Sequence, residues 1–257
     1  MTYEIEQLGS RLRGARITSG ILETLYDIGH LLNKLILIFD TFIGGILMTK
    51  NKKIIFQGTI ISVQPRIRLT RSFDQSSHTY LGFLLRIEGE IVGEEREFTV
   101  GIGKATQEKH KFKYHDIIKG KCLSVKNPDL EPVEYYKVSG LETINTSSEQ
   151  EEPPPWIDNP PTLEEYRERG HRRLSKRTYN SKCIPCIWGC CMAVEMIIDQ
   201  WNPRNKQFRT ETFCYGPKSC EFYKSGPNRK VPGRKGMVWE EPDWVDEENT
   251  AHRGLNE

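Results

Sequence analysis

Four of the chain's seven cysteines fall within nine positions, at Cys183, Cys186, Cys190 and Cys191. Such a cluster constrains the fold, because it serves a metal, a disulfide, a reactive thiol or a buried turn. The N-terminus has no short apolar run before a small-residue cleavage site, so we predict no signal peptide and a cytoplasmic, reducing compartment. In that compartment clustered cysteines indicate a metal more often than disulfides.

A second pair, Cys214 and Cys220, follows a segment that reads as two strands around a turn at 202–205. A Cys-x-x-Cys knuckle, a hairpin and a second pair resemble a zinc ribbon, in which four thiolates hold Zn²⁺ in a tetrahedron. Five residues separate the second pair, where two to four are usual. The resemblance implies the ligands Cys183, Cys186, Cys214 and Cys220, with Cys190 and Cys191 as alternative ligands.

An iron–sulfur centre is the alternative cofactor. Three cysteines of the first group could join Cys214 or Cys220 around a [4Fe–4S] cluster, which is also a four-thiolate site. If the site holds zinc instead, metal binding contributes folding free energy directly, because so small a hairpin has little core of its own.

Between residues 54 and 144 the pattern is that of five strands, with one helical or irregular stretch at 106–115 between the third and the fourth. The run "KYHDIIKGKCLSV" resembles the approach to the fourth strand of an OB-fold. We therefore expect a mainly β protein: a five-stranded OB-like barrel, a Pro-rich linker, a short basic helix and a small metal-stabilised, zinc-ribbon-like hairpin domain.

Composition places the domain boundaries. We predict an apolar helical extension at 1–47, the barrel at 48–145, a Pro/Glu-rich linker at 146–161, a basic Cys-rich metal-binding domain at 162–237 and an acidic tail at 238–257. The basic helix is predicted to begin after Thr162, which forms a capping box with Glu165, and to continue to Arg177.

The segment 17–48 is strongly apolar, with Ile21, Leu25, Ile28 and Leu32 at helical spacing. Lys34 and Asp40 lie in its most apolar part, and each costs about 2.5–3.5 kcal/mol at a bilayer centre. We therefore favour a packed or interfacial helix, and expect membrane contact only if this segment is translated and inserts. A polar start and a strand follow Met48, so a translation start at Met48 is an equal hypothesis.

Charge is distributed unevenly along the chain. Residues 161–237 carry sixteen basic and seven acidic side chains, a net of +9, whereas residues 238–257 carry one against seven, a net of −6. A basic module predicts a polyanionic partner, and the tail is a candidate competitor for the same surface.

The leading functional hypothesis is binding of single-stranded DNA or RNA, with aromatic side chains stacking on bases and basic ones contacting phosphates. The candidates are Arg66, Arg68, Arg71, Phe73, Tyr80, Phe83, Lys111, Lys113, Arg172, Arg173, Lys176, Arg177, Arg229, Lys230, Arg234 and Lys235.

We find no catalytic constellation: no phosphate-binding Gly-rich loop, no nucleophile elbow and no His-Glu-x-x-His. An iron–sulfur or thiol-dependent redox enzyme would have to use the cysteines. A scaffold that docks a partner enzyme is the third hypothesis, since acyl-CoA-associated OB proteins also join a four-cysteine ribbon to an OB barrel. In those proteins the ribbon precedes the barrel, and here it follows.

Overall fold

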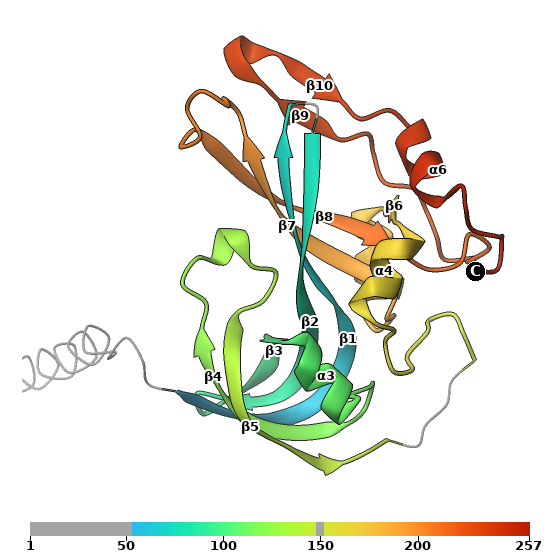
Figure 1. Cartoon of the computed structure of the whole chain (residues 1–257). Helices are drawn as coiled ribbons and strands as arrows, with labels where there is room; N and C mark the ends of the chain where they lie inside the picture. The colour runs from blue at the N-terminus through green and yellow to red at the C-terminus, as the bar shows by residue number, and fades with distance from the viewer. Residues whose placement is uncertain (1–52, 74, 148–151) are drawn as a thin grey trace, which may run out of the picture. The chain divides into compact units, whose positions relative to one another are not determined.

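Five strands in the first half of the protein form a ring (Figure 1). A computed structural model describes residues 53–73, 75–147 and 152–257, so the predicted helix at 17–48 lies outside the described residues. The strands of the ring are β1 (Ile54–Ser72), β2 (Gln75–Ile91), β3 (Glu94–Ile102), β4 (Ile117–Ser124) and β5 (Tyr135–Asn145). In the described part, no helix is long and apolar enough to cross a membrane.

The ring closes through the order β1-β2-β3-β5-β4-β1. Its neighbours pair antiparallel except β3 and β5, which meet in parallel at Val100 and Tyr135. The helix α3 (Lys104–His110) connects β3 to β4, where the sequence predicts a helical or irregular stretch. The mainly β character and the five strands are thus confirmed.

Alternation along the strands fills the ring. Apolar side chains that point inward are almost inaccessible to solvent, and Phe56 and Phe98 meet edge to face at 5.8 Å between ring centroids. Cys122 on β4 lies in this core, which suits a small apolar side chain. Burial of these faces is the main favourable contribution to the ring's stability.

The strand β1 extends beyond the ring and joins it to the Cys-rich segment. Its residues Arg68 to Ser72 pair in parallel with Ala193 to Ile197 of β7 (Gly189–Ile197). The strand β7 forms the predicted hairpin with β8 (Lys206–Cys214), and the short β6 (Arg172–Arg173) pairs with the end of β8. One eight-stranded sheet therefore contains the ring and the hairpin.

The basic helix is shorter than predicted. The helix α4 (Leu163–Arg169) has Thr162 as its N-cap, whose side chain accepts a hydrogen bond from the Glu165 amide at 3.2 Å. It ends at Gly170, which has a φ of 66° and leaves no room for a Cβ beside the Asn249 carbonyl. The prediction of a continuous helix to Arg177 is therefore wrong, because the chain enters β6 and only then the short α5 (Lys176–Thr178).

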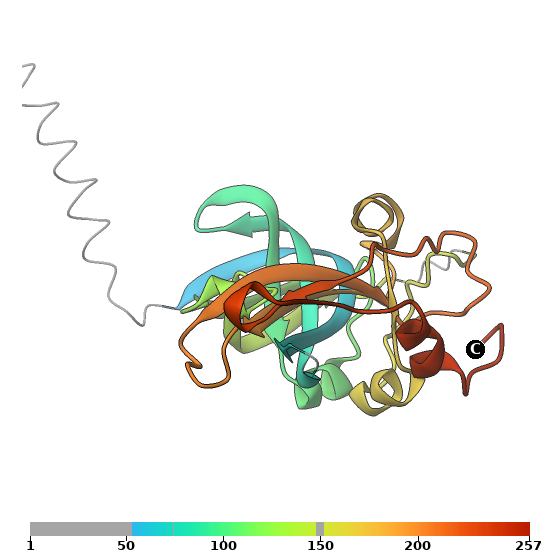
Figure 2. The ribbon, with the colours of Figure 1, turned by 90° about the horizontal axis from the view of Figure 1, so that it is seen from above.

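The C-terminal segment also has more structure than its glycines and prolines suggest. A second sheet pairs β9 (Lys230–Pro232) with β10 (Val238–Glu240), and the helix α6 (Trp244–Thr250) follows. Figure 2 shows this segment lying over the β7–β8 hairpin. The acidic residues of the predicted tail are part of this packing, as the ion pairs below show.

Candidate metal centre

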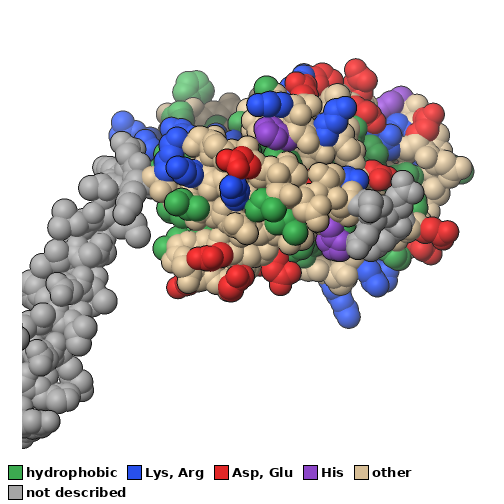
Figure 3. Space-filling view, turned by 90° about the horizontal axis from the view of Figure 1, so that it is seen from below, with side chains coloured by type: hydrophobic (Ala, Val, Ile, Leu, Met, Phe, Trp, Pro, Cys, Tyr) green, Lys and Arg blue, Asp and Glu red, His purple; other side chains and the backbone are tan. Residues whose placement is uncertain are grey.

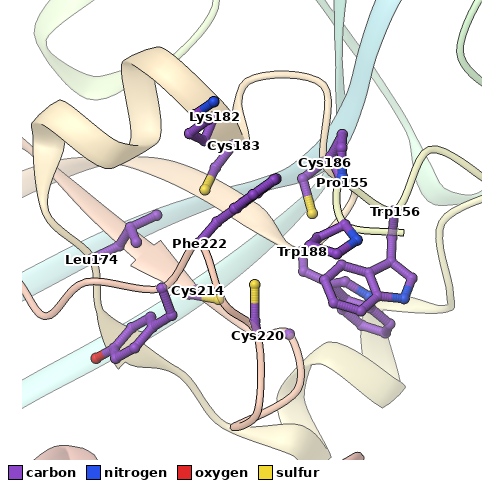
Figure 4. Close-up of a pocket in the computed structure, with 14 residues that line it drawn as sticks. Pro155, Trp156, Leu174, Lys182, Cys183, Cys186, Trp188, Cys214, Cys220 and Phe222 are labelled. Atoms are coloured by element: carbon purple, nitrogen blue, oxygen red, sulfur yellow. The ribbon is translucent and has the colours of Figure 1, made fainter. Parts of the chain in front are cut away.

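Cys183, Cys186, Cys214 and Cys220 line a single pocket. Cys183 ends a turn of π-helix at Tyr179–Cys183, Cys186 follows it, Cys214 ends β8, and Cys220 lies in the next loop. Figure 4 shows the four sulfur atoms pointing into the same space from opposite sides. The structure thus brings together the four cysteines of the zinc-ribbon resemblance.

Backbone amides donate hydrogen bonds to two of these sulfurs. Burial raises the pKa of Cys186 to about 12, while hydrogen bonds from the amides of Trp188 and Trp156 act to lower it. Burial likewise raises the pKa of Cys214, opposed by the amide of Gly216. Trp188 and Gly216 each lie two residues after their cysteine, so each turn presents an N–H to a sulfur that would bear negative charge as a ligand.

Gln64, a buried residue of β1, contacts the first Cys-x-x-Cys knuckle, residues 183–186. Its amide Nε2 donates to the carbonyl oxygens of Cys183, Ile184 and Cys186, each at 2.9 Å. Its Oε1 accepts a hydrogen bond from the Tyr179 hydroxyl at 2.7 Å. The carbonyls of Cys183 and Cys186 also accept backbone amides of the turn, so the Gln64 amide adds to these hydrogen bonds and fixes the knuckle against the sheet.

Aromatic and proline side chains form the wall of the pocket. Pro155 and Trp156 come from the segment predicted as a spacer, and the Trp156 carbonyl accepts a hydrogen bond from the Ile187 amide at 2.8 Å. The Arg169 guanidinium lies over the Trp188 ring, 4.3 Å from the centroid of that ring. These rings shield the thiols from water.

Strand alternation places the two remaining cysteines on opposite faces of β7, and Cys191 packs against the cluster that contains Cys183, Cys186 and Cys214. Cys190 is inaccessible to solvent in the core between ring and hairpin, where its Sγ lies 3.4 Å from the Pro65 carbonyl oxygen. Cys191 is on the opposite face of β7, and neither residue is in the pocket's lining. Burial raises the pKa of both thiols, that of Cys190 well above its ordinary value.

The four thiols suit a metal ion that binds four thiolates, but their sulfur atoms are not yet arranged around a common point. Within the described ranges, no three His, Cys, Asp or Glu side chains are already close enough to hold an ion, and all seven cysteines are free thiols. Burial, followed by the nearby Cys186, Cys214 and Cys220, raises the pKa of Cys183 to about 12. A cation would have to displace the protons and draw the sulfurs inward.

Three arginines predicted to contact nucleic acid are buried in ion pairs with acidic residues. Arg71 contacts Glu211 at 3.2 Å and Glu241 at 3.0 Å, and Arg229 also pairs with Glu211. Arg173, 1% exposed, pairs with Asp246 at 2.9 Å and with Asp243 at 2.6 Å. Glu241, Asp243 and Asp246 belong to the predicted acidic tail, so in this structure the tail neutralises part of the basic module itself.

Other candidates are engaged inside the protein. Arg66 and Arg68 share Glu131 at 3.5 and 3.0 Å, and Phe83 lies in the core of the ring. Phe73 packs against Gly233, Tyr80 lies beneath Arg167 at 4.8 Å, and Arg172 lies over Tyr223 at 3.8 Å.

The candidates that remain at the surface are lysines and arginines of short elements and turns. They are the half-buried Lys113 and the exposed Lys111, Lys176, Arg177, Lys230, Arg234 and Lys235. Figure 3 shows one face of the protein, on which Lys and Arg side chains stand among Asp and Glu side chains.

Sequence reasoning did not identify Gln64, Tyr179 or Trp156 as parts of the site. Gln64 lies 119 residues before Cys183, so no local pattern connects them. Pro154, Pro155 and Trp156 offered one signal, because an aromatic residue after a proline run favours a packed segment over a free spacer.

No protein family, curated protein or solved structure matches this chain.

Proposed function

We propose that this protein binds single-stranded nucleic acid, and that a zinc ion held by Cys183, Cys186, Cys214 and Cys220 stabilises the binding module. The convergence of four thiols, two of them receiving backbone N–H groups, carries the metal part of the proposal. Zinc would fasten the first knuckle to the loop after β8, and so fix β7 against β8 and the aromatic wall.

A single ion is favoured over a [4Fe–4S] cluster by the size of the pocket. The cavity between the side chains is about 10 Å³, which is the room that one water molecule needs. A cubane of eight atoms would require the aromatic wall to move. The raised pKa values of Cys190 and Cys191 also oppose a reactive thiolate, which a thiol-dependent enzyme needs.

The nucleic-acid part is supported by the ring and by the basic surface. The strand order with α3 between β3 and β4 resembles that of an OB-like barrel, and OB barrels bind single strands. Surface lysines and arginines of the Cys-rich segment supply positive charge for phosphates. Fold-level likeness is a weaker basis than a site, so the experiment must test binding directly.

Metal content is measured first, on full-length protein purified without oxygen or added chelator. We expect about one zinc per chain and no visible absorption, and loss of the metal in Cys183→Ser and in Cys214→Ser. Cys122→Ser is the matched control, since this buried thiol lies in the ring and should leave the metal in place. Iron with sulfide and a broad visible band would overturn the zinc assignment.

Binding is then titrated with labelled 12-nucleotide DNA and RNA oligomers at several salt concentrations. We expect affinity to fall linearly with the logarithm of salt, since phosphate contacts release counterions. Removal of zinc by a chelator should weaken binding together with the near-UV circular dichroism of the tryptophans. Zinc-loaded protein that binds neither oligomer at low salt contradicts the proposed function.

A further inference from the structure

The turns of two hairpins lie together at one end of the sheet. The β9 strand runs beside β8 in the opposite direction: Arg209 donates to the Lys230 carbonyl at 2.7 Å, and further along Arg234 lies 3.8 Å from Asp199. Figures 1 and 2 both show the β9–β10 turn next to the β7–β8 turn. Two segments about thirty residues apart in sequence therefore form one surface.

Large apolar side chains are exposed on this surface. Trp201, in the β7–β8 turn, is 85% exposed. Met237 and Val238, after the β9–β10 turn, are both more than half exposed. A tryptophan so open to water contributes little to the protein's own stability, because it buries almost no area.

The same surface is basic. No acidic residue occurs from Gln200 to Thr210 or from Phe222 to Trp239, whereas the two turns contain the exposed Arg204, Arg234 and Lys235. Arg234 is near one carboxylate, that of Asp199. Among the described residues, no carboxylate lies within ion-pair distance of Arg204 or Lys235, so their charges are available to a partner.

The outer edge of the ring has the opposite character. The β2–β3 hairpin exposes Glu88, Glu90, Glu94 and Glu95, and these carboxylates would repel phosphates. An anionic strand is therefore attracted to the hairpin turns and not to this edge of the ring.

We propose that the hairpin-turn surface, formed by Trp201, Arg204, Arg234 and Lys235, is where the protein holds single-stranded nucleic acid. This inference rests on the proposed function and gives it a location. Trp201 would stack on a base, while Arg204 and Lys235 would contact the backbone phosphates. An exposed ring near cations suits an unpaired base, because a duplex keeps its base faces stacked within itself.

The test compares full-length variants by fluorescence anisotropy with labelled oligo(dT) and oligo(rU) of 12 nucleotides. We expect Trp201→Ala to weaken binding roughly tenfold, which is the effect of losing one base–ring stack. The double variant Arg204→Glu, Lys235→Glu should weaken it further and reduce the salt slope by about one unit per lost phosphate contact. All these side chains are exposed, so thermal unfolding should be unchanged.

Matched controls separate this surface from the rest of the protein. Trp244→Ala removes another exposed tryptophan, 58% exposed on α6, and Lys121→Glu reverses an exposed lysine on β4. Neither control should alter affinity by more than about twofold. Losses in the controls equal to those in the variants would overturn the location, since binding would then follow net charge alone.

The outcomes distinguish the location from the function. Wild-type binding that Trp201→Ala and the double variant leave unchanged overturns the location while the proposed function stands. No binding of either oligomer by the zinc-loaded protein overturns both. Trp201-dependent binding to phosphatidylcholine–phosphatidylserine vesicles without binding to oligomers also overturns both, and identifies the surface as a membrane contact.

Discussion

The side-chain amide of Gln64 lies 2.9 Å from the carbonyl oxygen of Cys183. A residue of the ring thereby positions a cysteine of the candidate metal centre, although the two residues are 119 positions apart in the sequence. The same amide reaches the Cys186 carbonyl, and its oxygen receives the Tyr179 hydroxyl. Ring and knuckle are therefore coupled by one buried polar side chain.

Replacing Gln64 by Leu should destabilise the protein by about 2–4 kcal/mol, because three carbonyls and a hydroxyl lose a buried partner. Zinc affinity should fall about 10- to 100-fold, as when support of a ligand is removed. Urea unfolding and competition with a zinc chelator measure the two effects. Gln57→Leu, at an exposed position of the same strand, is the control and should stay within about 0.5 kcal/mol of wild type.

Gly189 is required where the knuckle meets β7. A Cβ there would lie 2.6 Å from the Cys183 carbonyl oxygen and 2.8 Å from the Gln64 amide nitrogen. We expect Gly189→Ala to cost about 1–3 kcal/mol, as overpacking does, and to weaken metal binding. Gly103→Ala is its control, because nothing lies within 4 Å of a Cβ at that position. Equal unfolding midpoints for the two variants would contradict the close-approach argument.

Stability should fall in mild acid. Burial, followed by the charge of Arg71, lowers the pKa of His78 to about 4, and burial lowers the pKa of His171, whose ring lies 4.8 Å away. A histidine whose pKa is lower in the folded state than in the unfolded state does not change the free energy of unfolding above its unfolded pKa of about 6.5. As the pH falls below that value, this histidine lowers the free energy of unfolding. For His78 the loss approaches roughly 3 kcal/mol near pH 4.

The measurement is the free energy of unfolding between pH 7.5 and 4.5. Glu241 and Glu211 face His78 and act to raise its pKa, and they remain in every variant. His78→Gln should flatten the pH dependence, while His252→Gln, at an exposed position, should not. A slope that both variants leave unchanged would assign the acid sensitivity to other groups.

The pairing of Arg173 with Asp246 should be critical for the C-terminal segment. Asp246 accepts the Arg173 backbone amide at 3.1 Å and its Nε at 2.9 Å. Asp246→Ala leaves a buried guanidinium with only the exposed Asp243 as a carboxylate partner, so we expect a loss of about 3 kcal/mol. Asp158→Asn, at an exposed position, is the control in the same thermal melts. A melting temperature equal to wild type would show that Asp243 alone suffices.

Much of the local structure follows from the sequence. Alternation predicts the strands, the Asn-Pro-Arg-Asn run predicts the turn between β7 and β8, and Thr162 with Glu165 predicts the start of α4. Each of these depends on neighbours within a few residues, where steric and hydrogen-bonding preferences act directly. The spacing of the cysteines likewise singled out the four that meet in one pocket.

Tertiary structure decided which charged and polar residues face the solvent. Arg71, Arg173 and Arg229 look like surface cations in sequence, yet each is buried because a carboxylate from a distant segment lies opposite it. Gln64 acquires its role only because β1 runs beneath the knuckle, and Asp199 and Arg234 become neighbours only because β9 lies along β8. Local sequence determines the strands and turns, whereas the burial of a charge depends on partners that only the folded chain brings together.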